Sequence, residues 1–224
     1  MKKIILTVAL IASFMNVSKA QDKAFKKGDI TAGLGIGLGI YGTRIHTTSS
    51  YQNLTFTHDT TDAAASVIYP LTLEYGITNW FGVGGRFAYS NYFTERDSLT
   101  GYKEKTTSLD ADLMLNFHLV KSKRFDMPIV LTVGYSRFKI NSNEPSQWMA
   151  RDNGINFGFA LNPRIYFGDH IGMFFNVGYA GYSYPSLRFS DKTDSNLNEN
   201  GDYRSTFSLK GNGANIGFGL IGKF

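Results

Sequence analysis

The chain has 224 residues, of which 42% are hydrophobic, 15% aromatic and only 18% charged. A hydrophobic share of this size excludes wholesale disorder, and the charged share lies below the roughly 25% of ordinary soluble domains. The 24 glycines, together with the many aromatic residues, favour β-structure over a helical bundle. Because the chain has no cysteine, disulfide scaffolds, cysteine-based zinc sites, a cysteine nucleophile and a lipobox-type lipid anchor are excluded.

The first twenty residues have the layout of a secretory signal peptide. Lys2 and Lys3 form a positive start, an apolar stretch covers residues 4–15, and Ser18-Lys19-Ala20 places small residues at a cleavage position. The apolar stretch is shorter than the ~20 residues that a membrane-spanning helix needs. We therefore expect residues 1–20 to be removed, which lowers the formal net charge from +5 to +2 because three lysines leave. The basic character of the full chain is then no argument for nucleic-acid binding.

From Gly28 onwards, apolar residues alternate with small or polar residues at a period of two. Strict alternation is the pattern of a β-strand whose two faces meet different environments. The sequence therefore predicts eight strands. They cover residues 30–40, 67–75, 81–89, 109–119, 129–135, 155–166, 173–179 and 214–224.

The connectors between these segments alternate in length. Short connectors cover residues 77–80, 120–127 and 168–170, and long polar connectors cover roughly 43–65, 92–107, 139–154 and 184–208. Strands of about 11 residues that rise ~3.3 Å per residue at a ~45° tilt would span the apolar band of an outer-membrane barrel. We predict an all-β fold, an eight-stranded antiparallel transmembrane β-barrel with short periplasmic turns and long extracellular loops. The barrel domain covers residues 28–224, and residues 21–27 form a periplasmic N-terminal segment.

The composition of the two faces predicts which one contacts lipid. One face carries Leu, Ile, Val and Phe, and the other carries mostly Gly, Ser, Ala, Asn and Thr with few charges. A soluble lipocalin-like barrel would present Lys and Glu to water, whereas small residues suit a narrow interior. Aromatic residues near the strand ends fit girdles at the lipid–water boundaries. They are Tyr69, Tyr89, Tyr135 and Tyr179 towards the long loops, and Tyr75, Trp80 and Phe81 towards the short turns. The alternative is an ordinary sandwich core.

Two segments resemble a known family, the small eight-stranded outer-membrane barrels with the outer-membrane protein β-barrel domain. The segments are Leu73–Gly84, typical of a first periplasmic hairpin, and the closing Gly217–Phe224. The resemblance covers essentially the whole mature chain, as a pattern and not as a catalytic motif. It implies a location in the outer membrane of a Gram-negative bacterium, among outer-membrane lipid and lipopolysaccharide. It also implies the barrel-assembly machinery and periplasmic chaperones as partners during biogenesis, and a monomer. The terminal strand resembles the assembly signal, carried by Phe218, Leu220 and Phe224.

The polar face predicts a lumen filled by side chains. It carries both signs of charge, so it offers no ring of one charge for ion selectivity. Eight strands leave an interior just wide enough for side chains, and buried charges must pair. We expect each lumen arginine to bond a carboxylate, with Arg86, Arg164, Glu74 and Asp112 meeting across the axis. The predicted network comprises Glu74, Arg86, Asp110, Asp112, Asn116, His118, Asn162, Arg164 and Asn176.

The remaining candidates for chemistry favour structural interpretations. The alternating glycines at 33–39 are followed by no helix pattern, so the dinucleotide fingerprint is not met and close packing explains them better. The first long connector holds four side chains that could bind a metal, although an exposed polar loop explains them better: His46, His58, Asp59 and Asp62. No serine, histidine and acid occur at a spacing typical of outer-membrane lipid hydrolases. We assign no catalytic residue, metal or cofactor.

Three functions stay open. The leading hypothesis is a structural or surface-binding barrel, not an enzyme, that displays loops above a side-chain-plugged lumen. A narrow porin-like channel for ions or small solutes comes second, and a lipid-modifying outer-membrane enzyme third. No motif names an extracellular ligand.

Overall fold

The computed structural model of this chain describes residues 24–52, 54–94, 104–142, 148–190, 196, 198–200 and 203–224. The predicted signal peptide lies outside these ranges. No helix within them is long and apolar enough to cross a membrane. The strands are β1 (Ile30–Tyr51), β2 (Leu54–Gly76), β3 (Phe81–Tyr92), β4 (Glu104–Lys121), β5 (Phe125–Ser142), β6 (Met149–Leu161), β7 (Arg164–Tyr166), β8 (Ile171–Ser190), β9 (Glu199–Asn200) and β10 (Tyr203–Lys223).

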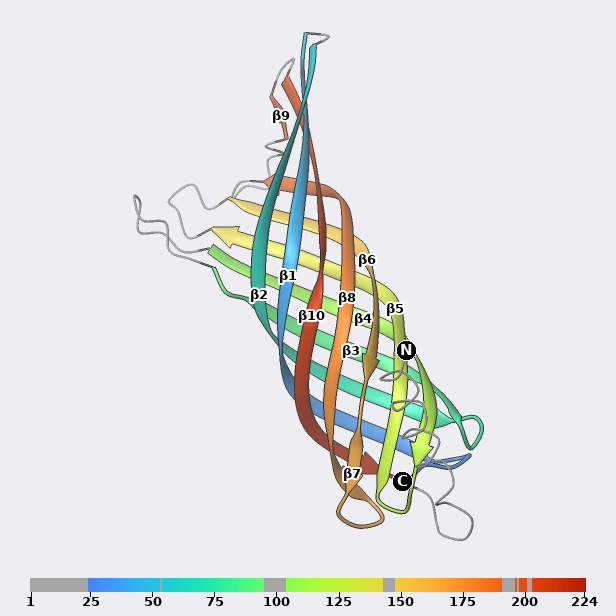
Figure 1. Ribbon diagram of the computed structural model, residues 1–224. Helices are drawn as coiled ribbons and strands as arrows, with labels where there is room; N and C mark the ends of the chain where they lie inside the picture. The colour runs from blue at the N-terminus through green and yellow to red at the C-terminus, as the bar shows by residue number, and fades with distance from the viewer. Residues whose placement is uncertain are drawn as a thin grey trace, which may run out of the picture.

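The strands form a closed antiparallel barrel (Figure 1). Each of β1 to β5 pairs with the next, β6 and β7 both pair with β5 and β8, and β8 pairs with β10, which returns to β1. β6 and β7 together occupy one position, and β9 is a two-residue strand that pairs only with the start of β10, so the ring has eight strands. The predicted fold class is confirmed, and each of the eight alternating segments lies in one position of the ring.

A proline explains why one position of the ring is split between β6 and β7. Pro163 has no N–H to donate to a strand ladder. The side chain of Asn162 instead donates from Nδ2 to the Phe175 carbonyl at 3.1 Å, and Phe175 N donates to the Pro163 carbonyl at 2.9 Å. The interrupted strand therefore stays attached to β8.

The segment 43–65 differs from its prediction as a connecting loop. β1 and β2 continue as a paired hairpin up to Tyr51 and Leu54, with Gln52 in the turn at a φ of 44°. This hairpin projects beyond the barrel (Figure 1). Its residues are mostly Thr, Ser, His and Asp on both faces, so no apolar alternation marks it in the sequence. Threonine nevertheless favours strands because its β-branched side chain suits a pleated surface.

The outward face of the barrel carries large apolar side chains that stay exposed, such as Leu34 and Leu113, at 64% and 51% exposure. The inward face is polar and buried, as at Asp110 and Asn116. In lipid, a closed ring satisfies every strand edge. Six residues of the predicted girdles are exposed on the outward face: Tyr69, Tyr75, Trp80, Tyr89, Tyr135 and Tyr179. The seventh, Phe81, is half-buried and packs against Phe117, with ring centroids 5.2 Å apart.

The segment that precedes β1 folds across the short-turn end of the lumen. Ala24 and Phe25 are fully buried, and Ala24 N donates to the Ser122 carbonyl at 2.8 Å. Gly28, at a φ of 88°, makes the turn into β1 in a conformation that favours glycine. Residues 24–29 therefore lie against the short-turn end of the lumen.

Candidate functional site

A buried ionic cluster fills the short-turn half of the lumen, centred on the carboxylate of Glu74 in β2. His118 Nε2 donates to Glu74 Oε1 at 2.7 Å, and Arg164 Nη1 donates to Oε2 at 2.7 Å. Thr31 Oγ1 donates to the same Oε2 at 3.2 Å. The ionic side chains are at most 5% exposed, so water does not screen their attraction.

Asp126 completes this cluster on the other side of the imidazole. His118 Nδ1 donates to its two carboxylate oxygens at 2.8 and 2.9 Å, and the Phe25 ring stacks on His118 with centroids 3.4 Å apart. Both ring nitrogens of His118 face carboxylates, which accept but do not donate, so the ring carries both protons and a positive charge. With Arg164, the cluster then holds two positive and two negative charges.

A second ionic cluster lies nearer the long-loop end. Arg86 Nε donates to Asp112 Oδ2 at 2.6 Å, and Arg86 Nη2 lies 3.9 Å from Asp110 Oδ2. Asp110 also accepts hydrogen bonds from Ser136 Oγ at 2.5 Å and from Tyr182 Oη at 3.2 Å. This cluster joins charged groups on β3 and β4 to the Ser136 hydroxyl of the neighbouring β5 and the Tyr182 hydroxyl of β8.

An aromatic layer lies above the second cluster. Tyr41 meets Tyr182 edge to face, with ring centroids 5.7 Å apart. Phe138 contacts both Tyr92 and Tyr184, at centroid distances of 6.0 and 5.1 Å. Such contacts are favourable beyond the area that they bury. The rings and the two ionic clusters therefore occupy successive levels of the lumen.

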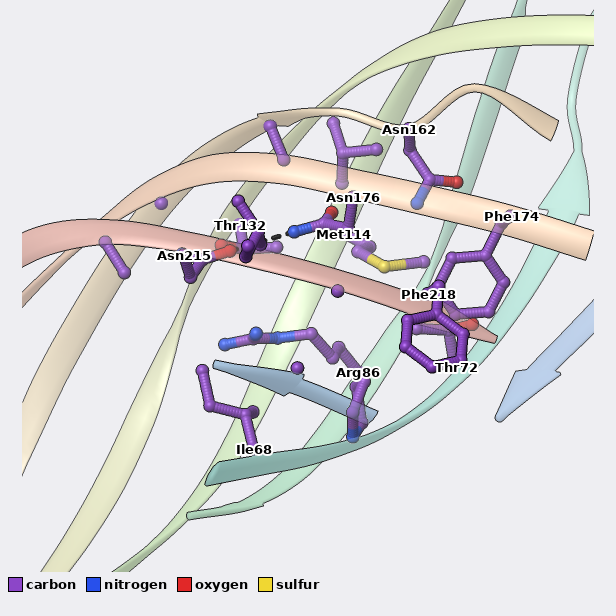
Figure 2. Close-up of a pocket in the computed structure, with 18 of the residues that line it drawn as sticks. Ile68, Thr72, Arg86, Met114, Thr132, Asn162, Phe174, Asn176, Asn215 and Phe218 are labelled. Atoms are coloured by element: carbon purple, nitrogen blue, oxygen red, sulfur yellow. Dashed lines mark hydrogen bonds between the residues drawn. The ribbon is translucent and has the colours of Figure 1, made fainter. Parts of the chain in front are cut away.

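A small cavity lies between the two ionic clusters, because its lining includes Arg86 from one and Arg164 from the other. Figure 2 shows residues of this lining. The volume of the cavity is about 90 Å³, and its lining also includes Phe174. Asn176 Nδ2 donates to Asn215 Oδ1 at 2.8 Å along one wall. Polar groups around a space of this size can hold a few ordered waters.

A larger cavity opens above the aromatic layer, at the end where the hairpin projects. We call it the cup: it has a volume of about 640 Å³, an aromatic floor that includes Tyr41, Tyr92 and Phe138, and a wall that includes residues 63–65. Two carboxylates, Asp62 and Glu104, line it, and none of the described lining residues is Lys, Arg or His. The described lining of the cup is therefore aromatic below, and its ionisable side chains are Asp62, Glu104 and the tyrosines.

The family described as outer membrane protein β-barrel domain matches residues 6–221. The chain belongs to this family. It is therefore an outer-membrane protein of a Gram-negative bacterium, and the exposed apolar band of the barrel faces lipid. No curated protein matches the chain.

The chain is similar to several solved structures of outer-membrane proteins. The outer membrane protein OprG of Pseudomonas aeruginosa is 15% identical, the match covers 89% of this chain and 97% of OprG, and the TM-score is 0.58. The outer membrane protease OmpT of Escherichia coli is 11% identical, with 94% and 100% covered and a TM-score of 0.48. Neisserial surface protein A is 11% identical, with 84% and 97% covered and a TM-score of 0.40. At these identities the likeness to OprG shows the fold alone.

The lumen residues of this outer-membrane barrel form two clusters, where we expected one meeting point. Arg86 bonds Asp112, its direct cross-strand partner, and Arg164 bonds Glu74 at the other level. The expectation that all four side chains meet is wrong because residue parity fixes a face but not a height along the tilted strands. His118 and Asn162 join the Glu74 cluster, Asp110 joins the Arg86 cluster, and Asn176 lies between them.

Two further groups of predicted residues have a place in the barrel. Asn116 is fully buried, and its amide has no hydrogen-bond partner among the described residues. Phe218 and Leu220 are exposed on the lipid-facing side of β10, and Phe224 exchanges backbone hydrogen bonds with Ile30. Their part in an assembly signal stays a prediction.

Several lumen residues were not predicted from the sequence, although most of them continue the alternating pattern of the predicted strands. Asp126 was placed in a short connector, yet it continues the inward-facing parity of β5, as Ser136 does farther along. Tyr182 and Tyr184 continue the inward-facing parity of β8 beyond the predicted strand. Phe25 gave no periodic signal because it precedes the first strand.

The histidines of the projecting hairpin do not gather as a metal site. His46 Nδ1 lies 2.8 Å from Asp59 Oδ1, while Arg44 Nη2 donates to Asp59 Oδ2 at 2.6 Å. His58 pairs with Thr47 on the opposite face. Among the described residues, no group of three histidines or carboxylates could hold a metal ion. Thr48 Oγ1 lies 3.3 Å from His46 Nε2. The side chains of Arg44, His46, Thr48 and Asp59 all lie on one exposed face of the hairpin.

The contacts of Asp59 with Arg44 and His46 should make the stability of the projecting hairpin depend on pH. Hydrogen bonds from Arg44 and His46 lower the pKa of the Asp59 carboxyl to about 2. A lowered pKa favours the paired hairpin above the ordinary pKa of ~3.9, and this contribution is lost as the pH falls through about 2. We expect Arg44→Gln to raise the Asp59 pKa towards ~3.9 in a carboxyl NMR titration. His58→Gln, on the other face, should leave it unchanged, and an equal shift in both variants would contradict the assignment.

Proposed function

We propose that this barrel is a non-conducting, non-enzymatic surface-binding protein in which the cup receives a small ligand. The observation that supports this function most strongly is the filled lumen below the cup. Two buried ionic clusters, centred on Glu74 and on Arg86, and an aromatic layer lie one above another along the axis. Charges that pair in a buried site are held by strong mutual attraction because little water screens them, which disfavours an open path through such clusters.

The lining of the cup favours an aromatic ligand that is uncharged or positive. A volume of about 640 Å³ falls within the range of small-molecule sites. The floor offers ring surfaces, which attract apolar groups and cations alike. The carboxylate of Asp62 repels an anion, and none of the described lining residues is Lys, Arg or His.

Binding of three related probes to the purified full-length barrel in nanodiscs tests this function. We expect tryptamine and indole to bind and indole-3-acetate not to bind, as followed by NMR line broadening. Ala64 lines the cup, so Ala64→Trp should fill it and weaken tryptamine binding at least about tenfold, which is about 1.4 kcal/mol. Thr61→Trp, on the outward face of the same strand, is the matched control and should bind as the wild type does.

Planar-bilayer recordings separate this function from the channel alternative. The wild-type barrel should show no stable conductance steps. Stable conductance together with equal probe binding in both tryptophan variants would contradict the proposal and favour a narrow channel.

A further inference from the structure

One strand edge of the projecting hairpin is not covered by any described residue (Figure 1). β2 pairs with β1 along the whole hairpin, whereas its pairing with β3 ends at Ser66 and Tyr92. On the other side of the hairpin, β1 pairs with β10 up to Tyr51 and Tyr203. Residues 54–64 of β2 therefore present backbone N–H and C=O groups that no described strand pairs. We call these residues the free edge.

The free edge lacks the features that usually protect a strand edge from a further strand. Proteins protect such edges with Lys, Pro, a bulge or a very short strand. Residues 54–64 include no Lys, Arg, Pro or Gly, and they pair with β1 in an unbroken register. Four of the eleven are threonines, which favour strands, and the carboxylate of Asp59 is already held by Arg44 at 2.6 Å. The free edge is therefore suited to adding a strand.

The backbone of the free edge allows antiparallel pairing with a second copy of itself. The Ala65 carbonyl accepts a hydrogen bond from Phe93 N at 2.8 Å, so it points away from β1. Because these groups alternate along a strand, the odd-numbered residues of the free edge also direct theirs away from β1. When two free edges pair about Thr60, opposing residues lie equally far from Thr60 along the chain. Odd-numbered residues then face odd-numbered residues, as the hydrogen-bond ladder requires.

The side chains of the free edge are complementary in this register. His58 lies opposite Asp62 of the second copy, and symmetry makes this pair twice, so an imidazole N–H can donate to a carboxylate at both places. Phe56 lies opposite Ala64 of the second copy. Centring the pairing on His58 or on Asp59 instead would place that side chain opposite its own copy, which is unfavourable for the two carboxylates. Charge complementarity therefore selects a second copy of this chain, in one register.

We propose that the free edges of two copies pair antiparallel about Thr60 and join two barrels head to head. Because the second strand runs the opposite way, its barrel points in the opposite direction, so the two copies lie in two facing membranes. Nine residues separate Thr60 from the girdle residue Tyr69, which is roughly 20–30 Å for a tilted to upright strand. The two membranes are then about 40–60 Å apart. The pairing holds two cells together and needs no ligand in the cup.

Cysteine scanning of the purified full-length barrel in nanodiscs tests the register. The chain has no cysteine, so a single introduced cysteine reports only contact with a second copy. Thr60 opposes itself in a non-hydrogen-bonded pair, with Cα atoms about 4.5 Å apart, a separation that a disulfide bridges. Thr57→Cys on the same exposed strand is the matched control, because it lies about 20 Å from its copy. Mild oxidation should give at least about tenfold more covalent dimer for Thr60→Cys than for Thr57→Cys.

Mixed samples and electron micrographs give the pairing and its direction. His58→Cys and Asp62→Cys should each remain monomeric alone and should cross-link when the two variants are mixed. Micrographs of cross-linked Thr60→Cys should show two discs face to face. Equal dimer yields for Thr57→Cys and Thr60→Cys, or two barrels side by side in one disc, would overturn the proposal.

A proline on the free edge tests the backbone pairing itself. Thr61 directs its N–H away from β1, so Thr61→Pro removes a donor to the second copy while leaving the pairs with β1 in place. In the Thr60→Cys background it should abolish the covalent dimer, and an unchanged yield would contradict pairing through the backbone. If heat-modifiable gel migration shows that this variant does not fold, the mixed cross-link of His58→Cys with Asp62→Cys decides, and its absence overturns the proposal.

Discussion

Replacing Arg164 with methionine is expected to lower the free energy of unfolding by about 3–5 kcal/mol. The guanidinium bonds Glu74 at 2.7 Å and lies 3.8 Å from Asp126, and all three side chains are at most 5% exposed. Its removal leaves two buried carboxylates with only the His118 ring between them. Methionine keeps much of the side-chain volume, so the loss of charge dominates the effect over the loss of packing.

A double variant separates the ionic effect from a packing effect. Glu74→Gln added to Arg164→Met leaves one carboxylate, Asp126, facing one positive ring, and should recover part of the lost stability. Urea unfolding in lipid vesicles, followed by gel migration of unheated samples, measures each step. Arg137→Met, at an exposed outward position, is the control and should change stability by no more than about 0.5 kcal/mol. A cost near zero for Arg164→Met would indicate a water-filled lumen.

The second large effect is expected on the lipid face. Leu113 lies near the middle of β4, is 51% exposed, and pairs with Gly85 midway along β3. Leu113→Arg should destabilise the barrel by about 2–4 kcal/mol because the charge would lie near the bilayer midplane. Leu109 faces the same way four residues nearer the long-loop end, where it pairs directly with the girdle residue Tyr89, so Leu109→Arg should cost only about 0–1 kcal/mol. Equal costs, measured by the same unfolding assay, would mean that the depth assignment is wrong.

The positions of several lumen side chains could be predicted because alternation acts locally. Glu74, His118 and Arg164 were placed on the inward face from sequence parity, and the structure has all three buried there. Their partners could not be derived in the same way. Contacts such as that between Glu74 and Arg164 join residues 90 positions apart, and parity says nothing about the height at which two tilted strands bring side chains together.

The cup and the closed short-turn end were also beyond a periodic analysis. Phe25 precedes the first strand, and its stacking on His118 depends on how residues 24–29 fold across the barrel. The aromatic floor needs Tyr41, Tyr92 and Phe138 from three strands at one level. None of these residues is distinguished from ordinary strand aromatics by its own neighbours in the sequence.

The amino-acid sequence by itself determined the number of ring positions, the lipid-facing side and the membrane in which the protein resides. Alternate residues of a strand point to opposite faces, whichever strand they pair with. The face that contacts lipid carries apolar side chains, and the face that lines a narrow interior carries small or polar ones. Only the tertiary structure decided that the lumen charges form two clusters, that residues 43–65 continue as a hairpin, and that Phe25 stacks on His118. Strand register and tilt set these arrangements, because they depend on backbone pairing between segments far apart in the chain.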